Sequence, residues 1–284
     1  MFAHSTNARC WDALDALVHC REHERAYKDC GVTPENQPLL ELPPGRSWPS
    51  PVGSVWHTAL LVLFLVALAL LQYQPQLRAS ETQFAHLTRV YIATIVYEWV
   101  LVGYVWFFGL RRRGVKIAEI VGGRWRSGVD FFIDFGIALG FWGVVLVVLG
   151  ALSYALHFSG EEAAQFLLPR TPVEMVVFVV LACCAGFCEE VVFRGYLQRQ
   201  FCAWTGSVVA GVALQALVFG SAHLYQGPKA VLVISVYGAM FGTLAALRKS
   251  LRPGMLQHAG QDTFSGLVGR FVLKAAHQLH MLRF

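Results

Sequence analysis

Two adjacent glutamates and an arginine form the first group of residues that could do chemistry, inside a strongly apolar stretch. Glu190 and Arg194 are four residues apart, so on a helix they share a face and can form an ion pair. Glu189 is rotated by about 100° from Glu190 and points elsewhere. The arginine then neutralises one carboxylate, while the other is free to act as a general base. A charge pair at the cytosolic end of a helix is the alternative interpretation.

A histidine downstream could reach the same depth as the free glutamate. The segment Trp204–Ser207 is expected to form a turn between two helices, centred on Gly206. Glu189 lies 17 residues before Gly206, and His223 lies 17 residues after it. In an antiparallel helical hairpin these two side chains therefore come to the same level. A packed or interfacial histidine is the alternative for His223 on its own.

A third group combines a histidine and an aspartate. His258 and Asp262 are four residues apart, so they face the same way on a helix. The alternatives are a pair that supports a site from outside it, or an interfacial histidine beside an aspartate that extends toward the membrane surface. Straight spans would keep His223 and His258 roughly 15 Å or more apart, at the rise of an α-helix. A shared site therefore requires a broken or tilted helix, or different boundaries for the last spans.

The composition indicates that membrane helices must position these residues. Hydrophobic residues make up 56% of the 284-residue chain and charged residues only 14%, against about 25% charged in soluble domains. This excludes a disordered chain and argues against an ordinary cytosolic globule. The net charge is +5, but the basic residues flank apolar runs instead of forming a phosphate-binding stripe, so we expect no nucleic-acid partner. The seven cysteines are expected to be free thiols.

The predicted fold class is all-α, a polytopic membrane bundle of about seven (six to eight) transmembrane helices. A spanning helix needs about 20 mostly apolar residues. The predicted spans are Val52–Tyr73, Val90–Leu110, Phe131–Leu156, Pro172–Leu197, Val208–Leu224, Ala230–Leu247 and Gly254–Val272. The second span carries the single acidic residue Glu98, and the seventh is interrupted by Asp262 and Arg270.

Charge distribution predicts the orientation of a multi-pass protein of the cell membrane. Basic residues crowd the connection between the second and third spans, which should be cytoplasmic, as should the N-terminus. These residues are Arg111, Arg112, Arg113, Lys116, Arg124 and Arg126. Residues 1–50 form a polar, proline-rich cytoplasmic segment without a visible signal peptide, and residues 51–284 form the transmembrane domain. The zinc-ligand types of the first segment match no standard zinc spacing. They are His19, Cys20, His23 and Cys30.

The three groups together resemble the three-motif signature of the CPBP intramembrane endopeptidases. The motifs are Glu189-Glu190-x-x-x-Arg194, Phe219-x-x-x-His223 and His258-x-x-x-Asp262. That family includes CAAX prenyl endopeptidases and bacteriocin-processing or immunity proteins. The resemblance covers about residues 129–272 and implies hydrolysis of a peptide bond in a membrane-associated, possibly lipidated, protein or peptide.

The resemblance also implies roles for the motif residues. Glu189 would activate a water molecule with help from His223, and His258 with the residue at 262 would stabilise the oxyanion. Glu190, Arg194 and Phe219 would support the site structurally. The family position is Asn or Asp, and an ionised Asp262 cannot donate a hydrogen bond. It would have to be protonated, orient His258 or bind a metal.

A metal and two other functions remain open at this stage. Glu189, His223, His258 and Asp262 are a plausible ligand set for a divalent ion such as zinc, although we expect no obligatory cofactor. The same ionisable residues could relay protons or ions in a transporter. A catalytically idle binding or immunity protein on the same scaffold is the other alternative. The sequence contains no His-Glu-x-x-His and no Gly-x-Ser-x-Gly, which argues against zinc and serine proteases of those types.

Overall fold

The structure is a computed structural model that describes residues 50–73, 87–158 and 167–281, with side chains described up to residue 269. These ranges contain helices and no strand, so the predicted all-α class is confirmed. The N-terminal segment, with its candidate zinc ligands, lies outside the described residues.

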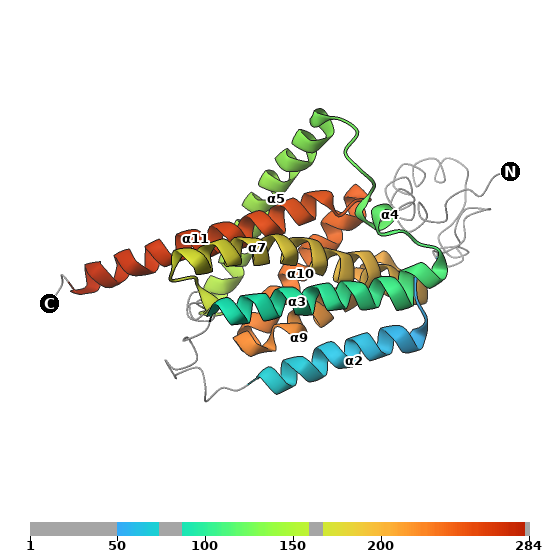
Figure 1. The fold of residues 1–284 in the computed structure, drawn as a ribbon, viewed down its shortest axis with the longest axis horizontal. Coiled ribbons are helices and arrows are strands. Elements are labelled where there is room, and N and C mark those ends of the chain that lie inside the picture. The colour runs from blue at the N-terminus through green and yellow to red at the C-terminus, as the bar shows by residue number, and fades with distance from the viewer. Residues whose placement is uncertain (1–49, 74–86, 159–166, 282–284) are drawn as a thin grey trace, which may run out of the picture.

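Helices of very different lengths make up the bundle (Figure 1). The first half of the chain forms α2 (Val55–Gln72), α3 (Leu87–Tyr104) with the π-helical η4 (Val105–Leu110) and the short η5 (Arg111–Arg113), α4 (Ile117–Val121) and α5 (Gly128–Ala155). The second half forms α7 (Pro172–Glu189), the π-helical η7 (Glu190–Gln198), α8 (Arg199–Thr205), α9 (Val208–Ala222), η8 (Leu224–Gln226), α10 (Pro228–Arg248) and α11 (Arg252–Met281).

Five helical runs of the described residues are long and apolar enough to cross a membrane. They are Val55–Gln72, Leu87–Arg113, Gly128–Ala155, Pro172–Thr205 and Pro228–Arg248. All seven predicted segments are helical, but two of them do not meet this criterion. The fifth segment forms α9, whose 15 residues rise only about 22 Å, less than a bilayer core of about 30 Å. The seventh lies in α11, where polar residues interrupt the apolar run.

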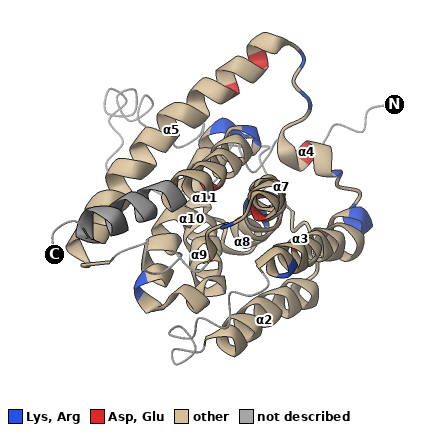
Figure 2. Cartoon of the chain, turned by 60° about the vertical axis from the view of Figure 1, so that its left-hand side comes forward, with Lys and Arg blue, Asp and Glu red and all other residues tan. Residues whose placement is uncertain are grey.

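The helix with the paired glutamates lies in the middle of the bundle. In Figure 2, α7 lies between α3 on one side and α10 and α11 on the other, and its ribbon is coloured red at acidic positions. α2 lies at the edge of the bundle, and α5 leans away from it (Figure 1). This arrangement surrounds the predicted site with four helices while leaving the outer faces apolar.

The predicted hairpin between the fourth and fifth segments is present. Gly206 ends α8 with φ 65° and ψ 17°, a left-handed conformation that glycine adopts without steric cost. The Ser207 hydroxyl then caps α9 by accepting from the backbone N–H of Ala210. Phe193 and Phe219, each 13 residues from Gly206, lie with their ring centres 4.9 Å apart, which agrees with antiparallel pairing about this turn.

Unequal helix lengths remove the depth conflict between His223 and His258. The turn between α10 and α11 lies well inside the molecule, because a Cβ atom at Gly195 would lie 3.3 Å from Leu251. Gly195 precedes the Gly206 turn by 11 residues, or roughly 15 Å of helix. The run from α7 to α8 thus extends far past the start of α11. His258, seven residues past Leu251, is thereby brought level with the glutamates.

The short helix α4 holds the α10–α11 turn in this position. The carbonyl oxygen of Val121 accepts from the backbone N–H of Leu251 and from the hydroxyl of Ser250, both at 3.0 Å. The buried carboxylate of Asp134 on α5 forms ion pairs with Arg252 at 2.9 Å and with Arg248 at 3.4 Å. These contacts fix where α11 begins and therefore the level of His258.

Candidate active site

A buried ion pair forms the floor of the site. The Nη1 atom of Arg194 lies 2.9 Å from Oε1 of Glu190, and both side chains have no exposed surface. The guanidinium group packs between two aromatic rings, 4.3 Å from the centre of Phe219 and 5.0 Å from that of Phe241. The ion pair expected from the four-residue spacing is therefore present and is fully enclosed.

This pair lies in a π-helical segment, η7, that begins directly after Glu189. The wider turn of a π-helix is rare and occurs often at functional sites. All nine residues of η7 are buried. The change from α- to π-helix between Glu189 and Glu190 places the two carboxylates in different surroundings on one continuous helical run.

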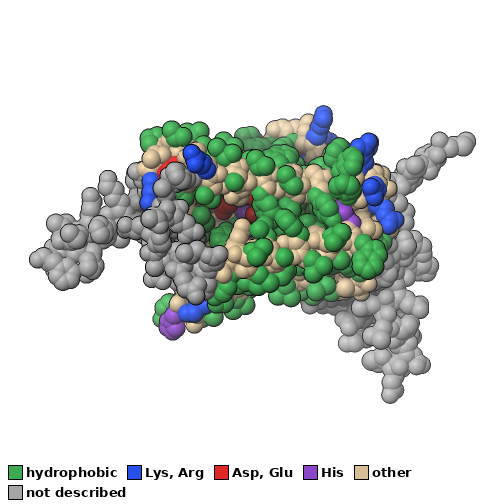
Figure 3. All heavy atoms as spheres, turned by 60° about the horizontal axis from the view of Figure 1, so that its bottom comes forward, with side chains coloured by type: hydrophobic (Ala, Val, Ile, Leu, Met, Phe, Trp, Pro, Cys, Tyr) green, Lys and Arg blue, Asp and Glu red, His purple; other side chains and the backbone are tan. Residues whose placement is uncertain are grey.

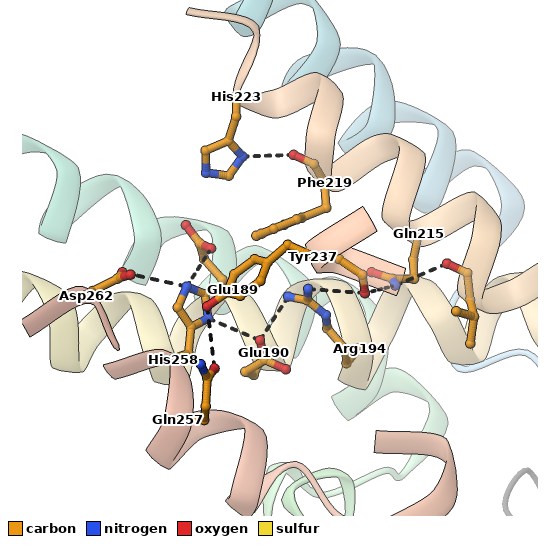
Figure 4. A network of polar contacts seen from close by, with 12 residues as sticks. Glu189, Glu190, Arg194, Gln215, Phe219, His223, Tyr237, Gln257, His258 and Asp262 are labelled. Atoms are coloured by element: carbon orange, nitrogen blue, oxygen red, sulfur yellow. Dashed lines mark hydrogen bonds and ion pairs between the residues drawn. The ribbon is translucent and has the colours of Figure 1, made fainter. Parts of the chain in front are cut away.

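His258 contacts three carboxylates with its two ring nitrogens (Figure 4). Nδ1 lies 3.2 Å from Oε1 of Glu190. Nε2 lies 3.6 Å from Oε2 of Glu189 and 3.7 Å from Oδ2 of Asp262. The first contact has hydrogen-bond length, whereas the other two are ion-pair distances that leave room for adjustment. The histidine thus joins the buried pair to the two outer carboxylates.

Close approach of two helices makes these contacts possible. A methyl group at Gly186 on α7 would lie 2.8 Å from the backbone nitrogen of Ala259 and 3.0 Å from the carbonyl oxygen of Met255. Real Cβ atoms do not tolerate such distances, so only glycine fits here. Because Gly186 lies one turn before the glutamates, the crossing of α7 and α11 occurs at the site itself.

The other predicted histidine approaches from α9. His223 follows the last residue of α9, and its Nδ1 lies 2.9 Å from the carbonyl oxygen of Phe219. A carbonyl only accepts, so Nδ1 carries the proton and a neutral ring presents Nε2 as an acceptor. The ring of Phe219 lies 4.8 Å from that of His223 and 6.5 Å from that of His258. Both imidazoles therefore lie beside one phenyl ring.

Burial distinguishes the motif residues from one another. The side chain of Glu189 is 19% exposed and that of Asp262 is 38% exposed, whereas Glu190 and Arg194 are fully buried. The space-filling view shows acidic and histidine atoms in a recess of an otherwise apolar face (Figure 3). The arrangement can bring a water molecule or a substrate to Glu189, while the pair beneath it stays inaccessible.

The structure also reveals residues near the site that the sequence analysis did not select. Tyr237 donates to Oε1 of Gln257 at 3.5 Å, and the amide of Gln257 donates to Gln261 at 2.6 Å. Glu98 on α3 is buried against the same region. The sequence marks Glu98 as the single acidic residue of an apolar span. It does not indicate that this residue lies beside α7.

The possible metal ligands of the described residues do not form a cluster. Among the described residues, no group of three or more His, Cys, Asp or Glu side chains is placed to hold a metal ion. Both nitrogens of His258 already face carboxylates, and Nδ1 of His223 is engaged by a carbonyl. No catalytic step is therefore assigned to a metal here.

Comparison with protein families gives one match. Residues 171–264 match the family described as type II CAAX prenyl endopeptidase, Rce1-like. The match includes all three motifs, from the cap of α7 to two residues past Asp262. Neither the curated proteins nor the solved structures give a match. The resemblance to CAAX-type membrane peptidases is confirmed for this segment, and its apolar helices make the chain an integral membrane protein.

Proposed function

We propose that this CAAX-type membrane peptidase hydrolyses its substrate with a water molecule activated by Glu189. The observation that carries the proposal is the different environment of the two adjacent glutamates. Glu190 is engaged in the buried pair with Arg194, whereas Glu189 is partly exposed and, among the described residues, contacts His258 at 3.6 Å. A general base needs this combination of a fixed position and access to water.

The proposed reaction proceeds by direct attack of water on the scissile carbonyl. Glu189 takes a proton from the water as the carbon–oxygen bond forms, and the same proton then passes to the nitrogen of the leaving amine. His223 presents its Nε2 acceptor toward this region and assists in holding the water. The second proton of the water stays on the new carboxyl group, so the product ends are a carboxylic acid and an amine, which become a carboxylate and an ammonium group by proton exchange. No covalent enzyme intermediate and no cofactor are required.

His258 is the best-placed group to stabilise the negative oxygen of the tetrahedral intermediate. Its ring is held by Glu190 at 3.2 Å, and a protonated imidazole donates from both ring nitrogens. Such fixed donors act strongly in a site from which water is excluded. Asp262 lies 3.7 Å from the same imidazole, which supports a role in orienting His258 from one turn away.

The substrate class follows from the family and the surroundings of the site. The matched family is described as type II CAAX prenyl endopeptidase, and acidic and histidine atoms lie in a recess of an apolar face (Figure 3). We therefore propose a membrane-associated substrate that carries a lipid near its cleavage site. A bacteriocin precursor or a sorting-signal protein is the alternative.

Comparison of membrane proteomes tests the function even though the substrate is unidentified. Cells with the wild-type chain should contain a truncated polypeptide that is absent from cells with Glu189→Ala. Glu174→Gln is the matched control, because Glu174 lies on the same helix and only caps its first turn. Identical proteomes for wild type and Glu189→Ala would contradict the proposal and favour a catalytically idle binding protein.

A further inference from the structure

A buried carboxyl group on α3 is outside all three motifs. Glu98 is only 4% exposed. Its Oε2 atom is buried and has no hydrogen-bond partner among the described residues. An unpaired carboxyl group in a membrane interior is costly and is retained where it has a function.

Neighbouring aromatic contacts place Glu98 at the level of the site. Tyr91 packs against Phe178 at 5.4 Å and Trp99 stacks on Phe187 at 5.6 Å. The later residue of α3 contacts the later residue of α7, so the two helices run parallel. Glu98, next to Trp99, therefore lies at the level of the last turn of α7, which ends with Glu189.

The charged groups that act on Glu98 are those of the site. Its electrostatic neighbours are Glu189, His258 and Asp262. Among the described residues, the region thus contains four carboxyl groups, with Glu190, and three basic groups, Arg194, His223 and His258. Because Arg194 is already paired with Glu190, it leaves Oε2 of Glu98 on α3 as an acceptor without a donor among the described residues. A ligand that supplies hydrogen-bond donors would complete the arrangement.

We propose that Glu98 is a substrate-binding residue whose free oxygen accepts a hydrogen bond from an N–H group of the peptide bound for attack at Glu189. A peptide in extended form presents backbone N–H groups that need acceptors once they leave water. The inference rests on the proposed peptidase function, and it assigns the acceptor to a helix that lies outside the matched family segment.

Affinity and stability should respond to Glu98→Leu in opposite directions. Removing an unpaired buried carboxyl group should raise the melting temperature, by roughly 2–4 °C. Loss of the acceptor should raise KM roughly 10- to 100-fold with kcat little changed. Glu98→Gln keeps a carbonyl oxygen and should restore most of the affinity. Thr94→Ala is the control one turn earlier, because its hydroxyl bonds to Val90 within the helix.

The experiment uses the full chain in lipid nanodiscs and one probe, an internally quenched farnesylated peptide ending in a C-a-a-X sequence. Cleavage gives KM and kcat, and binding without turnover is measured in Glu189→Gln as the rise in melting temperature with the probe. Adding Glu98→Leu to Glu189→Gln should remove most of that rise.

Two results would overturn the inference. One is a KM of Glu98→Leu within twofold of wild type, together with a probe-induced rise in melting temperature that is the same in Glu189→Gln with and without Glu98→Leu. The other is a fall in melting temperature in Glu98→Leu with normal affinity, which would make the residue structural. Failure of the proposed function is a different result, namely equal cleavage by wild type and Glu189→Gln. A probe that stabilises none of the variants would also contradict the assignment of Glu98.

Discussion

Two buried polar clusters lie on the same helical run and differ in how completely their groups are paired. The closed cluster joins α2, α3 and η7 through His57, Thr58, Tyr104 and Tyr196. Nδ1 of His57 lies 2.6 Å and Oγ1 of Thr58 lies 2.8 Å from the hydroxyl of Tyr196. Tyr104 stacks on His57 at 4.2 Å and donates to its carbonyl oxygen at 3.0 Å.

The site cluster uses similar groups but leaves some of them unsatisfied. It consists of Glu189, Glu190, Arg194, His258 and Asp262. Its outer contacts, from His258 to Glu189 and to Asp262, are 3.6 and 3.7 Å long. Its outer carboxylates reach the surface, whereas His57, Thr58 and Tyr196 are buried. The difference indicates that a fully paired histidine fixes helices, and that loosely paired carboxylates beside a histidine remain available for a substrate. Changes in each cluster should therefore affect different quantities.

Breaking the buried pair should have the largest effect on folding. Glu190→Ala and Arg194→Ala each leave one charge buried without its partner, which costs about 3–5 kcal/mol. Membrane abundance and thermal stability should both fall, and activity should fall with them. The double variant Glu190→Leu, Arg194→Met should recover part of the stability, because no unpaired charge remains. Normal yields of both single variants would show that the pair is not enclosed.

The closed cluster should affect stability and leave chemistry unchanged. Tyr196→Phe removes the hydroxyl that contacts His57 and Thr58, at a cost of about 1–3 kcal/mol. Thermal unfolding in detergent should show the loss, while the cleavage rate per folded molecule stays within about twofold. A large drop in kcat at normal stability would remove the distinction between the two clusters.

A change of Asp262, at the exposed edge of the site cluster, should have a mild effect on activity and should also test for a metal. Asp262→Asn should keep or raise activity, because an amide can donate to the oxyanion and still contact His258. If Asp262 bound a cation, Asn would bind it more weakly, so activity would fall and recover with added zinc or manganese. Activity that is unchanged and resists chelators is the expected outcome.

The N-terminal segment should have the smallest effect. A chain that starts near Ser47 retains Gly53, whose N–H and carbonyl groups bond to the Gln200 side chain at 3.0 and 2.9 Å. The membrane yield, which measures insertion, and the cleavage rate should both match those of the full chain. Normal insertion without cleavage would assign the segment to substrate capture or to the site.

Local spacing predicts part of the site, and tertiary contacts decide the rest. The pair of Glu190 with Arg194 and that of His258 with Asp262 follow from a four-residue separation on a helix. The level of Glu189 and His223 follows from equal distances to Gly206. Composition does not show that α9 ends at Ala222, or that contacts with Val121 and Asp134 hold the α10–α11 turn inside the molecule.

The closed cluster and Glu98 could not be found from spacing. Tyr196 and His57 are separated by 139 residues, and neither lies in a repeated pattern. Their contact depends on how α2 packs against η7. Glu98 is visible as an isolated charge in an apolar segment, but only the parallel packing of α3 on α7 brings it to Glu189. Long-range helix packing, not local sequence, sets both relationships.

The central claim, that Glu189 is the general base, is tested most directly by Glu189→Gln in purified protein. Gln keeps the size and hydrogen-bonding capacity of the side chain but cannot take a proton, so the cleavage rate should fall by about 10²- to 10⁴-fold. The melting temperature should stay near that of wild type, and Glu174→Gln should cleave normally. Full cleavage by a folded Glu189→Gln variant would contradict the account.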